Sequence, residues 1–364
     1  MPQNLSDSLA LIVMSDVVVD PCNDTTAWDW VYTIQPAYMA VICVLGAVGN
    51  AFVICILCQQ RRHRTVADVY LCNLAAADLV LVSCLPFWVV AVAGEFHWPF
   101  GELLCKLINT AISSNYFCSV LSLVLVSVDR YLALAHPLTF GRLRGVARAR
   151  RLCLAVWVAS VALSLPNLAF RTVRSFPELG VEACYLAYPH GGWRVQRNVT
   201  TNVVGFLVPV PVLTFCSYRI VYALRDSQPA GARSGLGAER KATRLVLVVF
   251  AVFILCWLPH QVFRFLDTLD YFQLMPSCTW GYVLDIGTQL STYLAYGNSA
   301  LNPLLYVMVG KQFRKKARGV FACLLARDTR SKSSLTIHLT STVRCNESTK
   351  ISLEQFKIQF PEKL

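Results

Sequence analysis

Charge is scarce in this sequence. Asp, Glu, Lys and Arg make up 15% of the 364 residues, whereas hydrophobic residues make up 55%. A soluble globular protein contains about 25% charged residues, and so the deficit indicates a membrane protein. Lys and Arg are absent from the first 60 residues, yet the chain has a net charge of +12. The basic residues must therefore be concentrated in particular segments.

Apolar runs long enough to cross a bilayer fill most of the chain. A transmembrane helix needs about 20 predominantly apolar residues. Seven such runs occur, with few acids, and they cover residues 34–58, 67–93, 107–128, 152–170, 199–218, 245–263 and 279–309. The sequence therefore predicts an all-α fold, a bundle of seven transmembrane helices over residues 34–309. No soluble domain of useful size fits between the runs.

The positions of Lys and Arg predict the orientation of the bundle, because cytosolic loops are enriched in these residues. Basic segments follow the first, third, fifth and seventh spans: RRHR (61–64), GRLRGVARARR (141–151), ERKATR (239–244) and GKQFRKKAR (310–318). We expect these segments in the cytosol, residues 1–33 outside the cell, and the protein in the plasma membrane. Nucleic-acid binding is not expected, because the basic residues lie where spans leave the membrane. A cleaved signal peptide is not expected either, because LALIVM (9–14) is short and lacks a basic segment before it.

The outer segments carry modification signals. Four of the fifteen cysteines fall outside the cell in this topology, where disulfides are the default, and they allow three pairings: Cys22, Cys105, Cys184 and Cys278. Three N-x-[ST] sequences on the outer side predict glycosylation, at Asn4, Asn23 and Asn198. On the cytosolic side, residues 310–325 have the pattern of an amphipathic helix on the membrane surface, with Cys323 as a palmitoylation candidate. Residues 326–364 read as a disordered tail.

Polar residues inside the spans cluster at comparable depths. They are Asn50, Asp78, Ser119, Asn298, Ser299 and Asn302. A buried carboxylate tends to take up a proton, and a small cation held by hydroxyl and amide oxygens would let Asp78 stay ionised. We therefore predict a sodium site at Asp78, Ser119, Asn298 and Ser299. The alternative is a static hydrogen-bond network that holds the helices together.

Catalytic and transport signatures are missing. The chain has neither GxSxG nor HExxH, which are signatures of serine and zinc hydrolases. Residues 279–309 contain no Lys for a retinal Schiff base. Paired half-repeats typical of transporters are not visible. We expect no enzymatic activity and no cofactor beyond an allosteric sodium ion.

Six motifs in the spans resemble the rhodopsin-like family of G-protein-coupled receptors, and the similarity covers about residues 30–325. They occur in the family's order and spacing: GN (49–50), LAAAD (74–78), DRY (129–131), Trp157, CWLP (256–259) and NPLLY (302–306). The resemblance implies a ligand site that includes Trp257. It also implies a switch to a heterotrimeric G protein, formed by Asp129, Arg130, Tyr131, Leu138, Glu239, Asn302, Pro303 and Tyr306.

The resemblance assigns roles to these switch residues. Arg130 would be held by Asp129 and Glu239 in the inactive state and released when the sixth span moves outward, while Leu138 inserts into the G protein. The Ser- and Thr-rich tail would be phosphorylated by receptor kinases and bind arrestin. The family's disulfide would join Cys105 to Cys184, which leaves Cys22 to pair with Cys278. One departure is Tyr218, which lies one position later than the tyrosine of many members.

Further stretches resemble the bradykinin (kinin) receptors: NLAAADLVLVSCLPFW, VSVDRYLAL, GRLRGV, NVVGFLVPV, FLDTLD and YVMVGKQFRKK. This implies a short basic peptide ligand and a Gq-type G protein that activates phospholipase C and releases calcium. Asp267 and Asp285 would bind the N-terminal Arg of the peptide, and Arg171 its carboxylate. Asn109 and Ser113 would line the deeper pocket, and Ser113 resembles the constitutive subtype, which takes the full-length peptide. The alternatives are a receptor for another peptide or a chemokine-like ligand, and a transporter.

Overall fold

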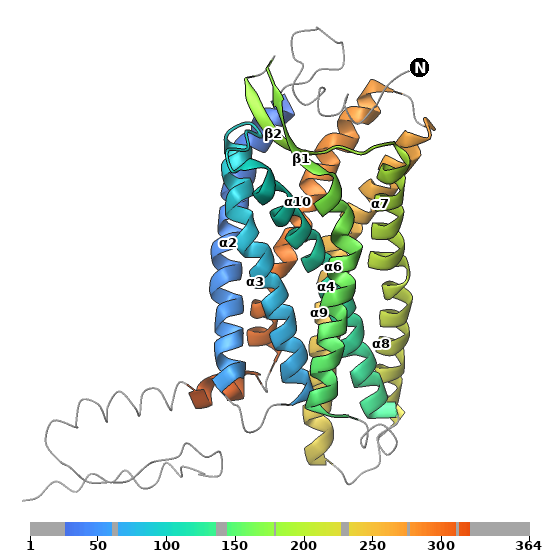
Figure 1. Ribbon diagram of the computed structural model, residues 1–364. Coiled ribbons are helices and arrows are strands. Elements are labelled where there is room, and N and C mark those ends of the chain that lie inside the picture. Colours follow the sequence, from blue (N-terminus) through green and yellow to red (C-terminus); the bar gives the residue numbers. More distant parts are fainter. Residues whose placement is uncertain are drawn as a thin grey trace, which may run out of the picture. The chain divides into compact units, whose positions relative to one another are not determined.

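The computed structural model describes residues 26–59, 65–135, 144–177, 180–226, 233–274, 277–310 and 313–320. The described residues between 26 and 309 contain nine helical segments, which form seven rods because α7, η2 and α8 follow one another along a single rod. The segments are α2 (Thr26–Gln59), α3 (Val66–Ala93), α4 (Gly101–Ala135), α6 (Val146–Phe170), α7 (Gly192–Asn202), the π-helix η2 (Val203–Leu207), α8 (Pro209–Asp226), α9 (Arg233–Tyr271) and α10 (Cys278–Val309). They lie side by side, roughly along one direction (Figure 1).

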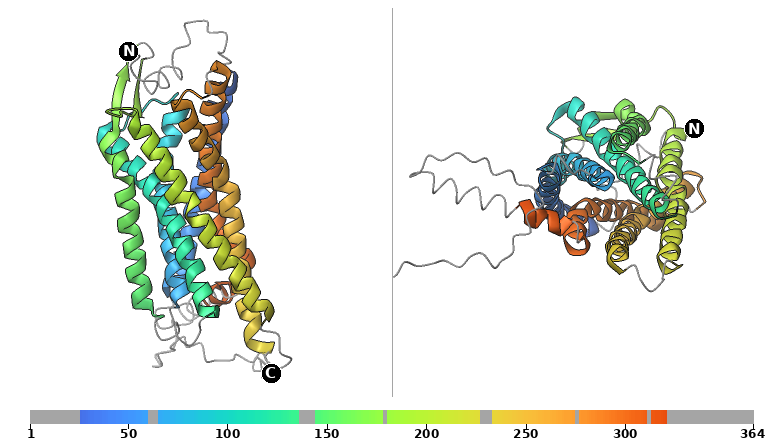
Figure 2. Two further views of the ribbon diagram at one scale, coloured as in Figure 1. Left: turned by 90° about the vertical axis from the view of Figure 1, so that its right-hand side faces the viewer. Right: turned by 90° about the horizontal axis from the view of Figure 1, so that it is seen from below.

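The helices pack around a common axis (Figure 2). α2 packs on α3 and α10, and α9 packs on α10. α4 has the most central place, because it contacts α3, α6, α8 and α9. Together with the seven rods, this packing confirms the predicted all-α bundle.

The outer surface of the bundle is apolar and part of its core is polar. On α6, Leu154, Val158, Val161 and Leu165 form an exposed stripe, while Ser160 and Ser164 on the opposite side are buried. Among the described helices, six rods are long and apolar enough to cross a membrane. The seventh, α10, carries frequent Gly, Ser, Thr and Asn residues. A bilayer around the bundle would cover the exposed leucines and valines, because burying apolar surface is favourable.

The helices differ from the sequence expectation mainly in their lengths. α2 begins at Thr26, eight residues before the predicted first span, because an apolar pattern marks only the part of a helix that lies in hydrocarbon. Residues 313–320 are helical, within the predicted membrane-surface helix. The strands β1 (Arg171–Phe176) and β2 (Val181–Leu186) form an antiparallel hairpin, which the all-α prediction omitted.

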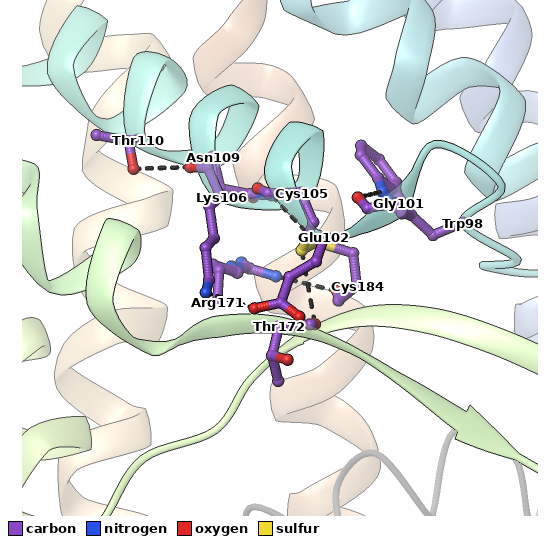
Figure 3. The surroundings of a disulfide bond; sticks show 10 residues. All are labelled: Trp98, Gly101, Glu102, Cys105, Lys106, Asn109, Thr110, Arg171, Thr172 and Cys184. Atoms are coloured by element: carbon purple, nitrogen blue, oxygen red, sulfur yellow. Dashed lines mark hydrogen bonds and ion pairs between the residues drawn. A yellow bond between two sulfur atoms is a disulfide. The ribbon is translucent and has the colours of Figure 1, made fainter.

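A disulfide fastens this hairpin to the bundle. Cys105 near the start of α4 is bonded to Cys184 in β2, and their Cα atoms lie 5.7 Å apart. The backbone N–H of Trp98 donates to the carbonyl of Glu182 at 2.6 Å, and its indole N–H donates to the carbonyl of Gly101 at 3.0 Å. The hairpin therefore lies across one end of the bundle, at the top of Figure 1, which we call the hairpin end (Figure 3).

Candidate functional site

A cavity of about 140 Å³ lies at the hairpin end, between α4, α6, β1, α7, α9 and α10. Four of the six predicted ligand-binding residues line it: Asn109, Ser113, Arg171 and Trp257. Asp267 and Asp285 do not line the cavity. Asp267 follows the lining residue Arg264 by one helical turn along α9.

The cavity is electropositive. Arg171, Arg197 and Arg264 line it together with His260. Within the described part of the chain, none of the three guanidinium groups forms an ion pair with a carboxylate. Arg171 donates to the carbonyl of Cys184 at 3.1 Å, and Arg197 donates to the hydroxyl of Tyr188 at 3.0 Å. Asp267 attracts Arg197 and Arg264 without an ion-pair contact, so the cavity still favours an anionic group of a ligand, because buried charges without a close partner are costly.

The pKa of Arg171 reflects its burial next to another cation. Burial, reinforced by repulsion from Arg197, lowers the pKa of Arg171 from 12.5 to about 10. The side chain is nevertheless charged at neutral pH. Its guanidinium also lies 6.0 Å from the ring centroid of Trp88, an attractive cation–π distance. An incoming carboxylate would stabilise the charged form further.

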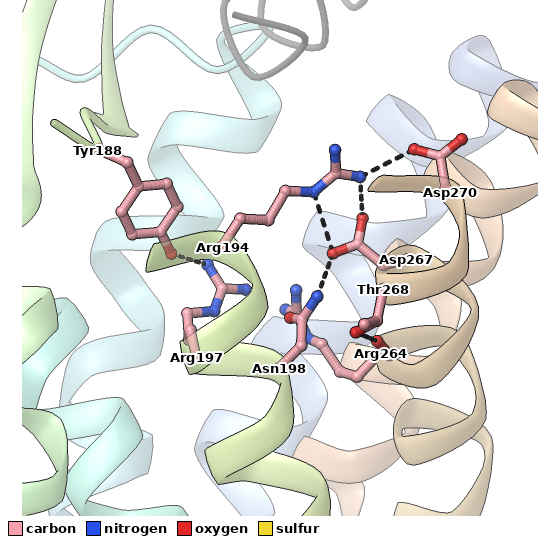
Figure 4. A network of polar contacts seen from close by, with 8 residues as sticks. All are labelled: Tyr188, Arg194, Arg197, Asn198, Arg264, Asp267, Thr268 and Asp270. Carbon is pink, nitrogen blue, oxygen red and sulfur yellow. Dashed lines mark hydrogen bonds and ion pairs between the residues drawn. The ribbon is translucent and has the colours of Figure 1, made fainter. Parts of the chain in front are cut away.

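An acidic cluster lies beside the cavity, in the turns of α9 at the hairpin end (Figure 4). Arg194 of α7 binds both Asp267 and Asp270 through one guanidinium nitrogen, and a second nitrogen donates to Asp267 at 3.3 Å. Asn198 also donates to Asp267, at 2.5 Å. Asp285 interacts electrostatically with this cluster. Asp267 stays a predicted ligand-binding residue, and in this structure Arg194 of the same chain already binds it.

The burial of Asn198 contradicts its predicted glycosylation. Its side chain is 1% exposed and faces α9, where it binds Asp267. A glycan on this nitrogen cannot be accommodated in such packing. The N-x-[ST] pattern does not report whether a helix turns the asparagine inward, and α7 does so here.

The floor of the cavity connects three helical rods. The rings of Trp257 and Tyr116 lie 4.3 Å apart. The hydroxyl of Tyr116 accepts from Gln261 of α9 at 2.7 Å and donates to the carbonyl of Thr201 in α7 at 3.2 Å. Sequence reasoning missed Tyr116 and Gln261, because only their convergence on Trp257 distinguishes them from other core residues.

The predicted polar cluster forms in the middle of the bundle. Asp78 is fully buried and accepts from Ser299 at 2.6 Å and from Asn302 at 2.8 Å. Asn50 donates to the backbone carbonyl of Ser299 at 2.9 Å. Ser119 is buried in α4, where it accepts from Asn115 at 3.5 Å. The side-chain oxygen of Asn298 has no hydrogen-bond partner in the described structure.

This donor set fits a small cation. A carboxylate, hydroxyl groups and an unpartnered amide oxygen are hard oxygen ligands, which suit alkali and alkaline-earth ions rather than zinc or copper. The same contacts also form the hydrogen-bond network that was the alternative to an ion site. Both interpretations share Asp78 and Ser299, whereas Asn50 and Asn302 belong to the network alone.

At the other end of α4, Asp129 has a partner that sequence reasoning missed. Arg144, which precedes α6, donates to both carboxylate oxygens of Asp129, at 3.0 and 2.7 Å. Arg130 lies 3.9 Å from the same carboxylate, so the predicted contact between neighbours exists but is the weaker one. The ring of Tyr131 packs edge-on against Phe215 of α8 at 5.6 Å.

Several predicted sites fall outside the described structure. Leu138, Cys22, Asn4, Asn23 and Cys323 lie in segments that are not described, and so does the tail 326–364. Glu239 and Cys278 lie in α9 and α10, but their side chains are not described. The Arg130–Glu239 contact and the Cys22–Cys278 disulfide stay predictions, whereas the predicted Cys105–Cys184 disulfide is present.

Comparison with known proteins finds extensive similarity. The profile of the family described as "7 transmembrane receptor (rhodopsin family)" matches residues 49–306. The B2 bradykinin receptor of Mus musculus is 46% identical over 307 residues, which cover 84% of this chain and 78% of that protein. The B2 bradykinin receptor of Homo sapiens is 45% identical over 80% of this chain and 75% of its own length. The B1 bradykinin receptor of Canis lupus familiaris is 40% identical over 86% of this chain and 91% of its own.

Proposed function

The chain belongs to the rhodopsin family of seven-transmembrane receptors, and from this premise we propose that it binds a short kinin-like peptide and activates a heterotrimeric G protein. Members of this family are cell-surface, multi-pass membrane proteins and not enzymes. The hairpin end would face outward and bind the peptide, as the distribution of Lys and Arg predicts. The opposite end, with Asp129 and Arg130, would then face the G protein.

The observation that carries this proposal is the separation of charge at the hairpin end. Arg171, Arg197 and Arg264 line the cavity, and the acids Asp267 and Asp285 lie beside it. A peptide with a free carboxylate at one end and a basic residue at the other complements this pattern when its carboxylate enters the cavity. Complementary charges also raise the association rate of a ligand. Asn109 and Ser113 would then contact the C-terminal part of the peptide.

Trp257 would couple ligand binding to the release of Arg130 at the opposite end of the bundle. Its ring contacts that of Tyr116 in a tilted arrangement at the cavity, and it belongs to α9, which also carries Pro259. A ligand that displaces Trp257 would shift α9, the helix whose cytosolic half carries Glu239. Outward movement of that helix would free Arg130 and open a cleft for a G-protein helix.

The first prediction tests receptor function directly. Purified receptor in lipid discs should accelerate nucleotide exchange when full-length bradykinin is added, most strongly on a Gq-type G protein. A C-terminally amidated bradykinin should bind at least about tenfold more weakly, because an ion pair desolvated in the cavity is worth at least about 1.4 kcal/mol. A scrambled peptide of the same composition is the control.

The variant Arg171→Gln provides a second control for this experiment. It should weaken the free-acid peptide and leave the amidated peptide nearly unchanged. Failure of bradykinin to accelerate exchange on any G-protein class would contradict the proposal. Equal binding of the free-acid and amidated peptides would contradict the orientation of the peptide but not receptor function.

An allosteric sodium ion at Asp78 is part of the proposal. Asp78, Ser119, Asn298 and Ser299 would supply its oxygen ligands. The support is the fully buried carboxylate together with the unpartnered oxygen of Asn298. Arrestin and receptor kinases are proposed as further partners, on the basis of the Ser- and Thr-rich tail alone. Phosphate labelling of the tail in agonist-treated cells tests their action, and no agonist-dependent label would contradict it.

A further inference from the structure

Arg194 forms ion pairs with Asp267 and Asp270 in the acidic cluster. The charge pattern of the sequence did not indicate these pairs. One terminal nitrogen of Arg194 lies between Asp267 and Asp270, at 3.0 Å from the latter (Figure 4). The side chain is 11% exposed, and those of Asp267 and Asp270 are 18% and 19% exposed. The three charges are therefore largely shielded from water, where a charge-assisted bidentate contact is stronger than at an open surface.

The guanidinium group of Arg194 binds Asp267. The N-terminal arginine of a basic peptide would bring the same chemical group to this carboxylate. A ligand arginine would approach Asp267 with a planar guanidinium, and Arg194 already presents one to both oxygens of that carboxylate. Two acids and one arginine leave a net negative charge, and Asp285 interacts electrostatically with all three groups. Within the described residues, Asp285 has no hydrogen-bond or ion-pair partner of its own.

We propose that Arg194 is a tethered competitor of the ligand, which lowers the receptor's preference for a basic residue at the N-terminus of the peptide. This inference rests on the proposed function, because it assumes a peptide whose first residue reaches Asp267. The ligand arginine must displace Arg194 from Asp267 or bind Asp285 alone. Arg194 is therefore a specificity-determining residue, and its contact also holds α7 against α9 in the ligand-free receptor.

The test compares two peptides on a series of variants at one position. The peptides are full-length bradykinin and an analogue whose first arginine is replaced by norleucine. The quantity measured is the ratio of the Kd of the analogue to the Kd of bradykinin. In Arg194→Gln this ratio should rise by about tenfold over wild type, which corresponds to about 1.4 kcal/mol. Arg194→Lys keeps the charge but loses the planar fork, so its ratio should lie between the two.

Lys106→Gln is the matched control. It removes one positive charge at the same end of the bundle, but Lys106 pairs with Glu102 on its own helix, and the ratio should stay at the wild-type value. If Arg194→Gln does not fold, Arg194→Lys still tests the direction of the change. An unchanged ratio, or a ratio that falls, would overturn the inference and make Arg194 a support for the acidic site. If wild type binds no kinin at all, the proposed function fails too.

Discussion

Arg144 is the side chain on which the buried carboxylate of Asp129 chiefly depends. Asp129 is buried, and both of its oxygens accept from the Arg144 guanidinium. A buried charge without a partner is costly. The buried carboxylate of Asp129 therefore needs a cationic partner, and Arg144 supplies it. The contact also fixes the end of α4 against the start of α6, which is the region that carries Arg130.

Replacing Arg144 should therefore destabilise the receptor. Arg144→Ala leaves Asp129 with the more distant Arg130, and we expect a loss of about 1–3 kcal/mol, reduced from the value for a deeply buried pair because Arg144 is partly exposed. Thermal unfolding of purified receptor measures the change. Arg148→Ala is the control, because Arg148 is exposed near the start of α6. Equal Tm values for the two variants would contradict this role.

The π-helix η2 is the element that brings the floor of the cavity together. It follows α7 and precedes Pro209, and the N–H of Val208 donates to the carbonyl of Val203 at 3.0 Å. Pro209 has no N–H to continue the regular ladder, and π-type turns are frequent at functional sites. Gly205 lies within η2 against the ring of Tyr116, where a Cβ atom would overlap the hydroxyl.

Gly205→Ala should accordingly destabilise the bundle and disturb the contact between Tyr116 and Trp257. Overpacking of this kind costs about 1–3 kcal/mol, and the affinity for the peptide should fall as well. Gly281→Ala in α10 is the matched control, because a Cβ there meets no atom within 4 Å. Thermal unfolding and peptide binding are measured on both variants. Wild-type values for Gly205→Ala would show that η2 adapts freely.

At the scale of the whole molecule, the Asp78 cluster joins helices that are far apart in sequence. Asp78 lies in α3, its donors Ser299 and Asn302 lie in α10, and Asn50 connects α2 to the same site. An ion bound here would contact the centre of the bundle rather than one helix. Its binding energy would therefore stabilise the arrangement of the helices as a unit.

Sodium should raise the thermal stability of the ligand-free receptor. At a concentration one hundred times its dissociation constant, a ligand of the folded state adds about 2.7 kcal/mol. Tm is measured in sodium chloride and in N-methylglucamine chloride at equal ionic strength, so that screening is the same. In Asp78→Asn the difference between the two salts should disappear. Wild-type receptor with the same Tm in both salts would leave the hydrogen-bond network as the sole role of the cluster.

The sequence by itself determined the bundle, the family and the interior polar cluster. Apolar runs predict spanning helices because a bilayer leaves no other partner for backbone N–H and C=O groups. Asp78, Ser299 and Asn302 could be grouped because polar residues are expensive at that depth and must meet one another. Cys105 and Cys184, Asn109, Ser113, Arg171 and Trp257 were identified through the resemblance, and the structure brings these residues together at the hairpin end.

Only the tertiary structure decided which charges meet. Arg194, Arg197 and Arg264 read as separate basic residues in the sequence, yet two of them face the cavity and the third binds Asp267. Arg144 and Asp129 are fifteen residues apart along the chain. Electrostatic partners depend on distances of a few ångströms between side chains on different helices, and these depend on helix rotation, which apolar patterning constrains only loosely. For the same reason the sequence does not indicate the environment of Asn198. It belongs to a glycosylation signal, yet in the fold it is buried and donates a hydrogen bond to Asp267.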